Sequence, residues 1–434
     1  MVELQPFTGT RYNSELIPDL SSAIAPPYDV ISQKQQDELY AKNPFNVIRL
    51  EYPKPQDGDG NPYTTSALTL QEWKKNGILK DDKLSFYLLR HSFDFQGRYY
   101  ERLELLGAVP IQPWSHGSVL PHEHTGESAK LDRLNLLRAT KTNISPIMTV
   151  YDDNSNKLTE ILNTIVKTLP LISEFVTDDN EKYTFWQITD PKRIKAIQNS
   201  IQGPLYIADG HHRYETSLNY QNEENASGNL STAINYIMAS VTPIQDPGLV
   251  SLPYHRMLQN LSQDQVNRIL RQMSVYFESR SFDINGKPKE AIYELIEDQV
   301  YQTADATIGF IDGGMDELLV LTIKDPEAAQ GLFSSESDIW SKLSPCIFSD
   351  VLLKPSLGML QQEAEDRGFL TYTRDPFDAL EKLESKQVEQ VFILDGVPMD
   401  RMTKIAQEGE RLPHKSTYFH PKVATGFVLN TLDR

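Results

Sequence analysis

Two histidines, an arginine and an aspartate lie within five consecutive residues near the middle of the chain, Asp209-Gly210-His211-His212-Arg213, which we call the elbow. Arginine forms forked hydrogen bonds with phosphate oxygens, histidine donates hydrogen bonds or moves protons, and glycine lets the backbone approach a ligand. The ordinary alternative is an Asp-Gly turn with Arg213 paired to Glu215 or another neighbour and one buried histidine. Four polar side chains at one point favour a binding or catalytic role.

A strand and a helix must hold the elbow in place. The short apolar run 205–208 ends at Asp209, which predicts a buried strand followed by a turn. From Arg213 onward, Tyr214 and Leu218 lie four residues apart, as they do on one face of a helix. The N–H groups of a helix's first turn and the positive end of its dipole favour an anion beside them. The sequence therefore predicts a phosphate site here.

The second concentration of polar side chains is Pro121-His122-Glu123-His124-Thr125. In an extended chain His122 and His124 share a face, and Glu123 points to the other. Their spacing suits a metal, and histidines from elsewhere in the chain would complete such a site. The candidates for those further ligands are His211, His212 and His255.

A different interpretation makes Glu123 a general base. Lys130 and Arg133 follow on the next helix and would supply positive charge to a phosphate. Leu137 shares their helical face, so a packing or solvated role of that face also stays open.

Three further stretches carry candidate binding residues. Tyr28 and Asp29 follow two prolines and precede a helix that a capping box predicts to begin after Ser32, so they line a pocket or plug the structure. His255 and Arg256 follow a short predicted strand and face the same pocket or the surface. Near the carboxyl end, Lys415 lies in a stretch rich in lysine, histidine and aromatic residues, which predicts a strand that returns a lysine to the phosphate site or a solvated edge strand.

The composition describes a folded, acidic protein. Hydrophobic residues make up 39% of the 434 residues and charged residues 24%, which fits two or three globular domains. The net charge of −18 disfavours nucleic acid and anionic membranes as partners. No signal peptide or membrane-spanning run is seen, so we expect a cytoplasmic protein. The one cysteine, Cys346, excludes an intramolecular disulfide and reads as a small buried residue.

The rest of the chain alternates between predicted strands and helices, which indicates a mixed α/β fold. We expect an N-terminal α/β region over 1–110, a core over 111–260 that carries the elbow, and a C-terminal α/β domain over 261–434. The common glycine-rich nucleotide loops are absent, so a nucleotide site must be of another kind. Among the individual predictions are strands at 45–51, 85–93 and 99–110, the latter two forming a hairpin, and helices at 64–76 and 261–277.

Five stretches together resemble a broad microbial family of unknown function, whose core is assigned to the ParB and sulfiredoxin superfamily. They fall in order along nearly the whole chain, and a set of five is far more specific than any one of them. The stretches are Pro26-Pro27-Tyr28-Asp29-Val30-Ile31, Pro121-His122-Glu123-His124-Thr125, Ala208-Asp209-Gly210-His211-His212-Arg213-Tyr214-Glu215-Thr216, Asp246-Pro247-Gly248-Leu249 with Leu252-Pro253-Tyr254-His255-Arg256, and Lys415-Ser416-Thr417-Tyr418-Phe419.

The resemblance implies a ParB/sulfiredoxin-like core with N-terminal and C-terminal α/β extensions. In free-serine kinases of that superfamily an Asp-Gly-His-His-Arg stretch binds the nucleotide phosphates, and an upstream glutamate acts as base toward the serine hydroxyl. Glu123 is the matching residue here. His211 stands where sulfiredoxins keep their cysteine, so the sulfiredoxin reaction is not implied.

Three functions follow from these patterns. The first is a phosphotransferase that uses Mg²⁺ with ATP or ADP to phosphorylate a small hydroxylated metabolite, with free serine as one candidate. The others are a metal-dependent hydrolase built on His122, His124, His211 and His212, and a non-catalytic sensor of a nucleotide or phospho-metabolite. For the first function the predicted roles are as follows: Glu123, His211 and His212 in catalysis; Asp209, Gly210, His211, His212, Arg213, Lys130, Arg133 and Lys415 at the phosphates; Tyr28, Asp29, His124, Thr125, His255 and Arg256 at the substrate.

Overall fold

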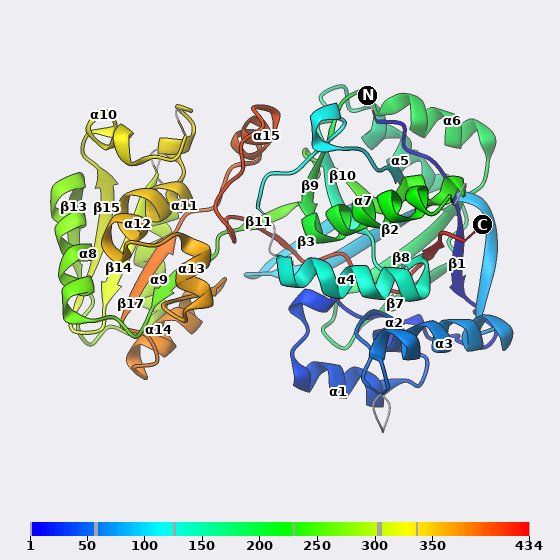
Figure 1. Cartoon of the computed structure of the whole chain (residues 1–434), viewed down its shortest axis with the longest axis horizontal. Coiled ribbons are helices and arrows are strands. Elements are labelled where there is room, and N and C mark those ends of the chain that lie inside the picture. The colour runs from blue at the N-terminus through cyan, green and yellow to red at the C-terminus, as the bar shows by residue number, and fades with distance from the viewer. Residues whose placement is uncertain are drawn as a thin grey trace. The chain divides into compact units, whose positions relative to one another are not determined.

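Apolar runs separated by turn residues fold into two large sheets, each with its own helices (Figure 1). A computed structural model describes residues 2–55, 60–124, 127–228, 231–301, 306–335 and 337–433. It divides the chain into unit 1, which comprises Met1–Pro121, Thr125–Val250 and Pro421–Arg434, and unit 2, which comprises His122–His124 and Ser251–His420. The mixed α/β class that the sequence predicts is confirmed.

The division into units differs from the three regions expected from the sequence. The regions 1–110 and 111–260 share one sheet and one unit. The chain also returns to unit 1 at its carboxyl end, where the strand β19 (Leu429–Thr431) pairs with β1 (Phe7–Tyr12) and β5 (Thr142–Asn143). Pairing between strands so far apart in sequence leaves no local signal, which is why this return was not predicted.

The sheet of unit 1 runs in the order β4-β9-β6-β10-β3-β2-β1-β19-β5, with β8 also paired to β2 and β7 paired to β8. The predicted hairpin is present as β2 and β3, and its turn residues Gln96 and Gly97 both have positive φ, as tight hairpin turns require. The remaining bounds are β2 (Leu79–Phe95), β3 (Arg98–Pro110), β4 (Val119–Leu120), β6 (Ile147–Tyr151), β7 (Ser173–Val176), β8 (Lys182–Ile188), β9 (Leu205–Asp209) and β10 (Tyr236–Pro243).

Helices pack on this sheet, and those nearest the elbow are α4 (Glu127–Thr140) and α7 (His211–Ala226), which lie side by side (Figure 1). The core beneath the elbow includes Ile147, Ile207 and Tyr214. The other helices of unit 1 are α1 (Gln33–Lys42), α2 (Ile48–Glu51), α3 (Pro62–Lys75), α5 (Lys157–Thr168) and α6 (Pro191–Ser200).

The strand predicted over 45–51 is wrong. The segment turns into α2 because the side chain of Asn46 accepts a hydrogen bond from the Ile48 N–H at 2.9 Å, while Asn43 accepts one from the Phe45 N–H at 2.8 Å. Side-chain acceptors of this kind compete with strand pairing. A short apolar run alone does not distinguish a buried strand from a buried helical turn.

Unit 2 has a sheet in the order β13-β15-β14-β17-β12-β16 and a separate pair of strands, β11 and β18. The predicted helix at 261–277 is present as α8, with the capping box of Ser262 and Gln265 at its start. Cys346 is buried in α11, and burial raises the pKa of its thiol. The strands are β11 (Val250–Leu252), β12 (His255–Leu258), β13 (Phe277–Asp283), β14 (Thr307–Asp312), β15 (Glu317–Ile323), β16 (Leu370–Thr373), β17 (Gln390–Leu394) and β18 (Tyr418–His420).

The helices of unit 2 cover its sheet and include a π-helical segment at Phe348–Leu353, in a region the sequence left unassigned. None of the helices in the described residues of either unit is long and apolar enough to cross a membrane. The α-helices are α8 (Gln263–Tyr276), α9 (Lys289–Ile296), α10 (Pro326–Ala329), α11 (Ser344–Ile347), α12 (Lys354–Leu357), α13 (Gln361–Asp366), α14 (Pro376–Glu384) and α15 (Met399–Gln407).

Candidate functional site

The elbow has the strand-turn-helix structure that the sequence predicts. β9 ends at Asp209, Gly210 turns the chain with a φ of 90°, and α7 begins at His211. A side chain at position 210 would lie 2.9 Å from the Ile147 side chain and about as close to Arg213, so only glycine fits. The amino end of α7 therefore stands directly after a strand, with the backbone N–H groups of its first turn on the side where an anion is favoured.

Two cations hold the Asp209 carboxylate at this turn. Its Oδ2 accepts a hydrogen bond from Arg213 Nη2 at 2.6 Å, and its Oδ1 is bound by the Lys422 ammonium. Burial alone would raise the pKa of Asp209, but the charges of Lys422 and Arg213 hold it well below its ordinary value. Buried His211 lies close enough to lower it further. Two cations, Arg213 and Lys422, thus surround one carboxylate at this turn, and the carboxylates of Asp29 and Glu51 also act on Arg213.

The Arg213 guanidinium is engaged by hydrogen bonds to other groups of the protein. Besides Asp209, its Nη1 donates to the Pro146 carbonyl at 2.5 Å and to Ser145 Oγ at 3.1 Å, and only 12% of its side chain is exposed. This guanidinium braces the turn. Lys422, bound to the other oxygen of Asp209 with 9% of its side chain exposed, is held in the same way.

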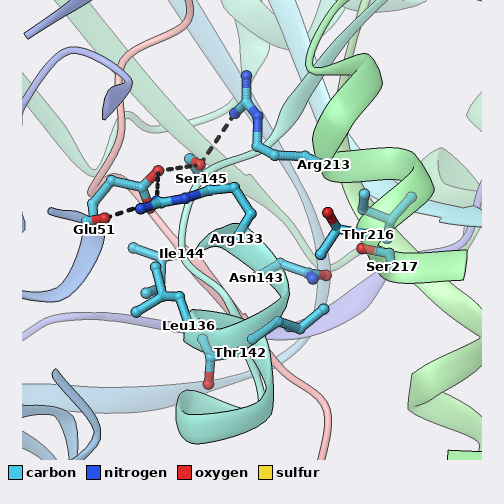
Figure 2. Close-up of a pocket in the computed structure, with 12 residues that line it drawn as sticks. Glu51, Arg133, Leu136, Thr142, Asn143, Ile144, Ser145, Arg213, Thr216 and Ser217 are labelled. Atoms are coloured by element: carbon cyan, nitrogen blue, oxygen red, sulfur yellow. Dashed lines mark hydrogen bonds and ion pairs between the residues drawn. The ribbon is translucent and has the colours of Figure 1, made fainter. Parts of the chain in front are cut away.

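A small cavity of about 50 Å³ lies next to Arg213 (Figure 2). Its polar wall is a chain of contacts in which Ser145 Oγ donates to Glu51 Oε1 at 2.9 Å and Arg133 Nη1 lies 3.5 Å from the same oxygen. Burial raises the pKa of Glu51, and the charges of Arg133 and Arg213 oppose the rise. A cavity of this size can hold ordered water, which needs about 10–15 Å³ of such volume.

Tyr28 and Asp29 belong to the same region. The Arg133 guanidinium lies 3.9 Å from the centre of the Tyr28 ring, and burial raises the pKa of Tyr28 to about 12. Asp29 is exposed, and its charge acts on Arg213. Lys130, the other predicted cation of α4, lies 3.3 Å from Glu215 of α7. The structure therefore brings Tyr28, Asp29 and Arg133 together with the elbow in unit 1.

Glu123 belongs to unit 2, where the segment after Lys415 holds it. Its Oε1 accepts hydrogen bonds from the Ser416 N–H at 3.0 Å, the Thr417 N–H at 3.0 Å and Thr417 Oγ1 at 3.2 Å. Buried His122 binds the same hydroxyl through Nε2 at 2.7 Å. Among the described residues no hydrogen bond engages Oε2, and 13% of the side chain is exposed. The carboxylate is thus fixed through one of its two oxygens.

The histidines of this stretch do not form a metal centre in the described parts of the chain. No group of three or more His, Cys, Asp or Glu side chains there is arranged to hold a metal ion. His122 is committed to Thr417, while His124 is exposed. His122 and His124 lie in unit 2, and His211 and His212 lie in unit 1. Thr125, a predicted substrate residue, lies outside the described residues.

His255 and Arg256 begin β12 and are both fully buried, where a surface position had been one of the two expectations. Burial lowers the pKa of His255 to about 3, so the ring is neutral. Lys415 has a φ of 59° and its ammonium lies 5.3 Å from the centre of the Tyr254 ring. Lys415 thus contacts an aromatic residue of unit 2, while Lys422 is the lysine that reaches the elbow.

Sequence reasoning missed three residues of the site in unit 1. Lys422 binds Asp209, which lies 213 positions away in the sequence. Glu51 and Ser145 connect Arg133 to Arg213 through hydrogen bonds and an ion pair. Lys422 lay within the basic stretch that the sequence singled out, so a signal for it existed. No signal in the sequence marks Glu51 or Ser145, because their roles depend on side chains from distant segments.

Comparison with known proteins gives the family. The model of the family described as protein of unknown function DUF1015 matches residues 4–344. The chain belongs to the DUF1015 family. No curated protein matches this DUF1015 member.

Solved structures with a similar fold are distant from this DUF1015 protein. A conserved hypothetical protein from Pyrococcus furiosus has 12% identity and a TM-score of 0.36, with 74% of this chain and 92% of that chain covered. A free serine kinase variant in complex with AMP has 10% identity and a TM-score of 0.37, with 73% and 87% covered. SbnI from Staphylococcus aureus, truncated at its carboxyl end, has 10% identity and a TM-score of 0.35, with 74% and 85% covered. Likenesses this low carry no argument about function.

Proposed function

We propose that the protein is a phosphotransferase that moves a phosphoryl group from ATP or ADP to a small hydroxylated metabolite, with free serine as one candidate. The observation that supports it most is the elbow, where a helix begins at a glycine and two cations surround one carboxylate. Phosphoryl transfer depends mainly on positioning and positive charge. The ParB/sulfiredoxin-like assignment of the core is part of the same proposal.

In this proposal the elbow binds the nucleotide phosphates. The N–H groups of the first turn of α7 and His212 hold the phosphate oxygens, while Arg213 and Lys422 keep the turn in shape through their contacts with Asp209. Glu123 takes the proton of the acceptor hydroxyl. The acceptor oxygen then bonds to the terminal phosphorus, the bond from that phosphorus to its bridging oxygen breaks, and the shortened nucleotide leaves.

Mg²⁺ would neutralise charge on the phosphates when bound with the nucleotide. Both oxygens of Asp209 are engaged by cations, so this carboxylate does not suit a metal. Asp29, which is exposed and acts electrostatically on Arg213, fits as a carboxylate that could hold the ion.

Replacing His212 tests the phosphate site. We expect His212→Ala to raise the Kd for ATP or ADP by about tenfold or more, because a charge-assisted hydrogen bond contributes roughly 1.5–3 kcal/mol. Isothermal titration calorimetry measures the change. His116→Ala, an exposed histidine of the same unit, is the matched control and should leave the Kd unchanged. Equal affinities for all three proteins would remove the elbow from nucleotide binding.

Asp29→Asn tests the amino-terminal segment. We expect turnover to fall at least tenfold while the melting temperature stays within about a degree, because an exposed carboxylate contributes little to folding. Raising the Mg²⁺ concentration should recover part of the activity. A large drop in melting temperature with normal turnover would show that the segment is a structural plug.

A further inference from the structure

Arg256 in unit 2 is a buried cation without a counter-ion. Its side chain has no exposed surface, and among the described residues it forms no ion pair. Nη1 donates to the Tyr254 carbonyl at 2.7 Å and Nη2 reaches the His414 carbonyl at 3.4 Å, while Nε finds no acceptor in the part of the chain that the structure describes. Burying a charge with neutral partners alone is costly, and such a group is stabilised by an anion.

The carboxylates that act on Arg256 are engaged elsewhere. Burial lowers the pKa of Arg256, and the negative charges of Glu123 and Glu365 oppose this shift. Oε1 of Glu123 is held by the Ser416 and Thr417 N–H groups. Oε2 of Glu365 accepts from Tyr372 Oη and binds His414 Nδ1, each at 3.1 Å. Within the described ranges, carboxylates therefore act on the guanidinium only at a distance and none contacts it directly.

The side chains around Arg256 suit a small acid. The Tyr372 ring lies 4.9 Å from the guanidinium, and the ring of Tyr254, which contacts Tyr372, lies 5.3 Å from the Lys415 ammonium. Tyr254, Tyr372 and Lys415 are all partly exposed. Lys415 also has a positive φ, a conformation that side-chain-bearing residues adopt at a cost and that is enriched at functional sites.

We infer that Arg256 and Lys415 bind the acid group, carboxylate or phosphate, of a small hydroxylated acid. The claim that this acid is the phosphoryl acceptor rests on the proposed function. The claim that unit 2 binds an acid is independent of it. Since Arg256 has no exposed surface, a side chain that covers it must move for the acid to reach it. The free Oε2 of Glu123, whose charge acts on Arg256, then serves an acceptor that is itself an anion.

Calorimetric titration without nucleotide tests the inference with three matched probes, D-glycerate, glycerol 3-phosphate and glycerol. The wild-type protein should bind at least one of the two acids at millimolar concentration and bind glycerol at least tenfold more weakly. Tighter binding of D-glycerate indicates a carboxylate site, and tighter binding of glycerol 3-phosphate indicates a phosphate site. Arg256→Met, which removes the charge and keeps the length, should weaken the acid at least tenfold. Arg280→Met, an exposed arginine of β13, should bind it as wild type does.

Several results would overturn the acid site: no binding of either acid, equal binding of glycerol, or equal acid affinity in wild type and Arg256→Met. If Arg256→Met does not fold, Lys415→Ala takes its place with the same expectations. ATP titrated into the same proteins keeps the two claims apart. Acid binding without ATP binding would contradict the proposed function and support the acid site. ATP binding without acid binding would contradict the acid site alone.

Discussion

Glu123→Gln is expected to lower turnover by about 10²- to 10⁴-fold and to leave the affinity for ATP or ADP unchanged. The substitution keeps an oxygen that can accept from the Ser416 and Thr417 N–H groups, so the segment that holds the side chain stays in place. It replaces the second carboxylate oxygen by an amide NH2 group, which cannot accept a proton from the acceptor hydroxyl. The chemistry is lost while the fold and the phosphate site remain.

Two controls separate the base from its surroundings. Glu278→Gln, an exposed carboxylate of β13 in the same unit, should leave turnover unchanged. Thr417→Val removes a hydroxyl that binds both Glu123 and His122, and it should lower turnover less than Glu123→Gln does. Thr417→Ser, which restores the hydroxyl, should recover most of the activity. Normal turnover in Glu123→Gln would contradict the assignment of the base.

Arg213→Ala is expected to destabilise unit 1 by about 3 kcal/mol, the lower end of the range for breaking a buried ion pair. The loss removes the partner of Asp209 Oδ2 and a donor to the Pro146 carbonyl, and Lys422 remains on the other carboxylate oxygen. Arg138→Ala is the matched control, because its pair with Glu223 joins α4 to α7 in the same unit and both side chains are 43% exposed. We expect that exposed pair to contribute less than about 1 kcal/mol.

Urea denaturation followed by tryptophan fluorescence measures both changes. The two units need not unfold together, so the signal must come from one of them. Trp340→Phe leaves Trp73, Trp114 and Trp186 as the remaining tryptophans, all in unit 1. Equal free energies of unfolding for Arg213→Ala and Arg138→Ala in this background would show that Arg213 does not brace the elbow.

Local patterns in the sequence predicted the elbow and its flanking elements well. An apolar run, an Asp-Gly pair and helical spacing from Tyr214 onward are enough to specify β9, the turn at Gly210 and α7. The capping box predicted at Ser32 likewise marks the start of α1. These signals are short-range, since the side chain that ends or begins an element lies within a few residues of it.

What the sequence could not specify is which distant segments meet. The basic stretch near the carboxyl end was expected to place a lysine at the phosphate site. In the structure its residues contact two different sites. Ser416 and Thr417 hold Glu123 in unit 2, and Lys422, a few residues later, binds Asp209 in unit 1. Glu51 was hidden for a further reason, because its segment was predicted as a strand and forms the helical turn α2.

The most direct test of the proposed phosphotransferase is phosphorus NMR of ATP or ADP incubated with Mg²⁺, the protein and a mixture of small hydroxylated metabolites that includes serine. We expect the terminal phosphoryl signal to decline as one new phosphomonoester signal grows in equal amount. We also expect Glu123→Gln to bind the nucleotide and to form no such product. Wild-type protein that leaves the nucleotide unchanged with every acceptor, or that releases only inorganic phosphate, would contradict it.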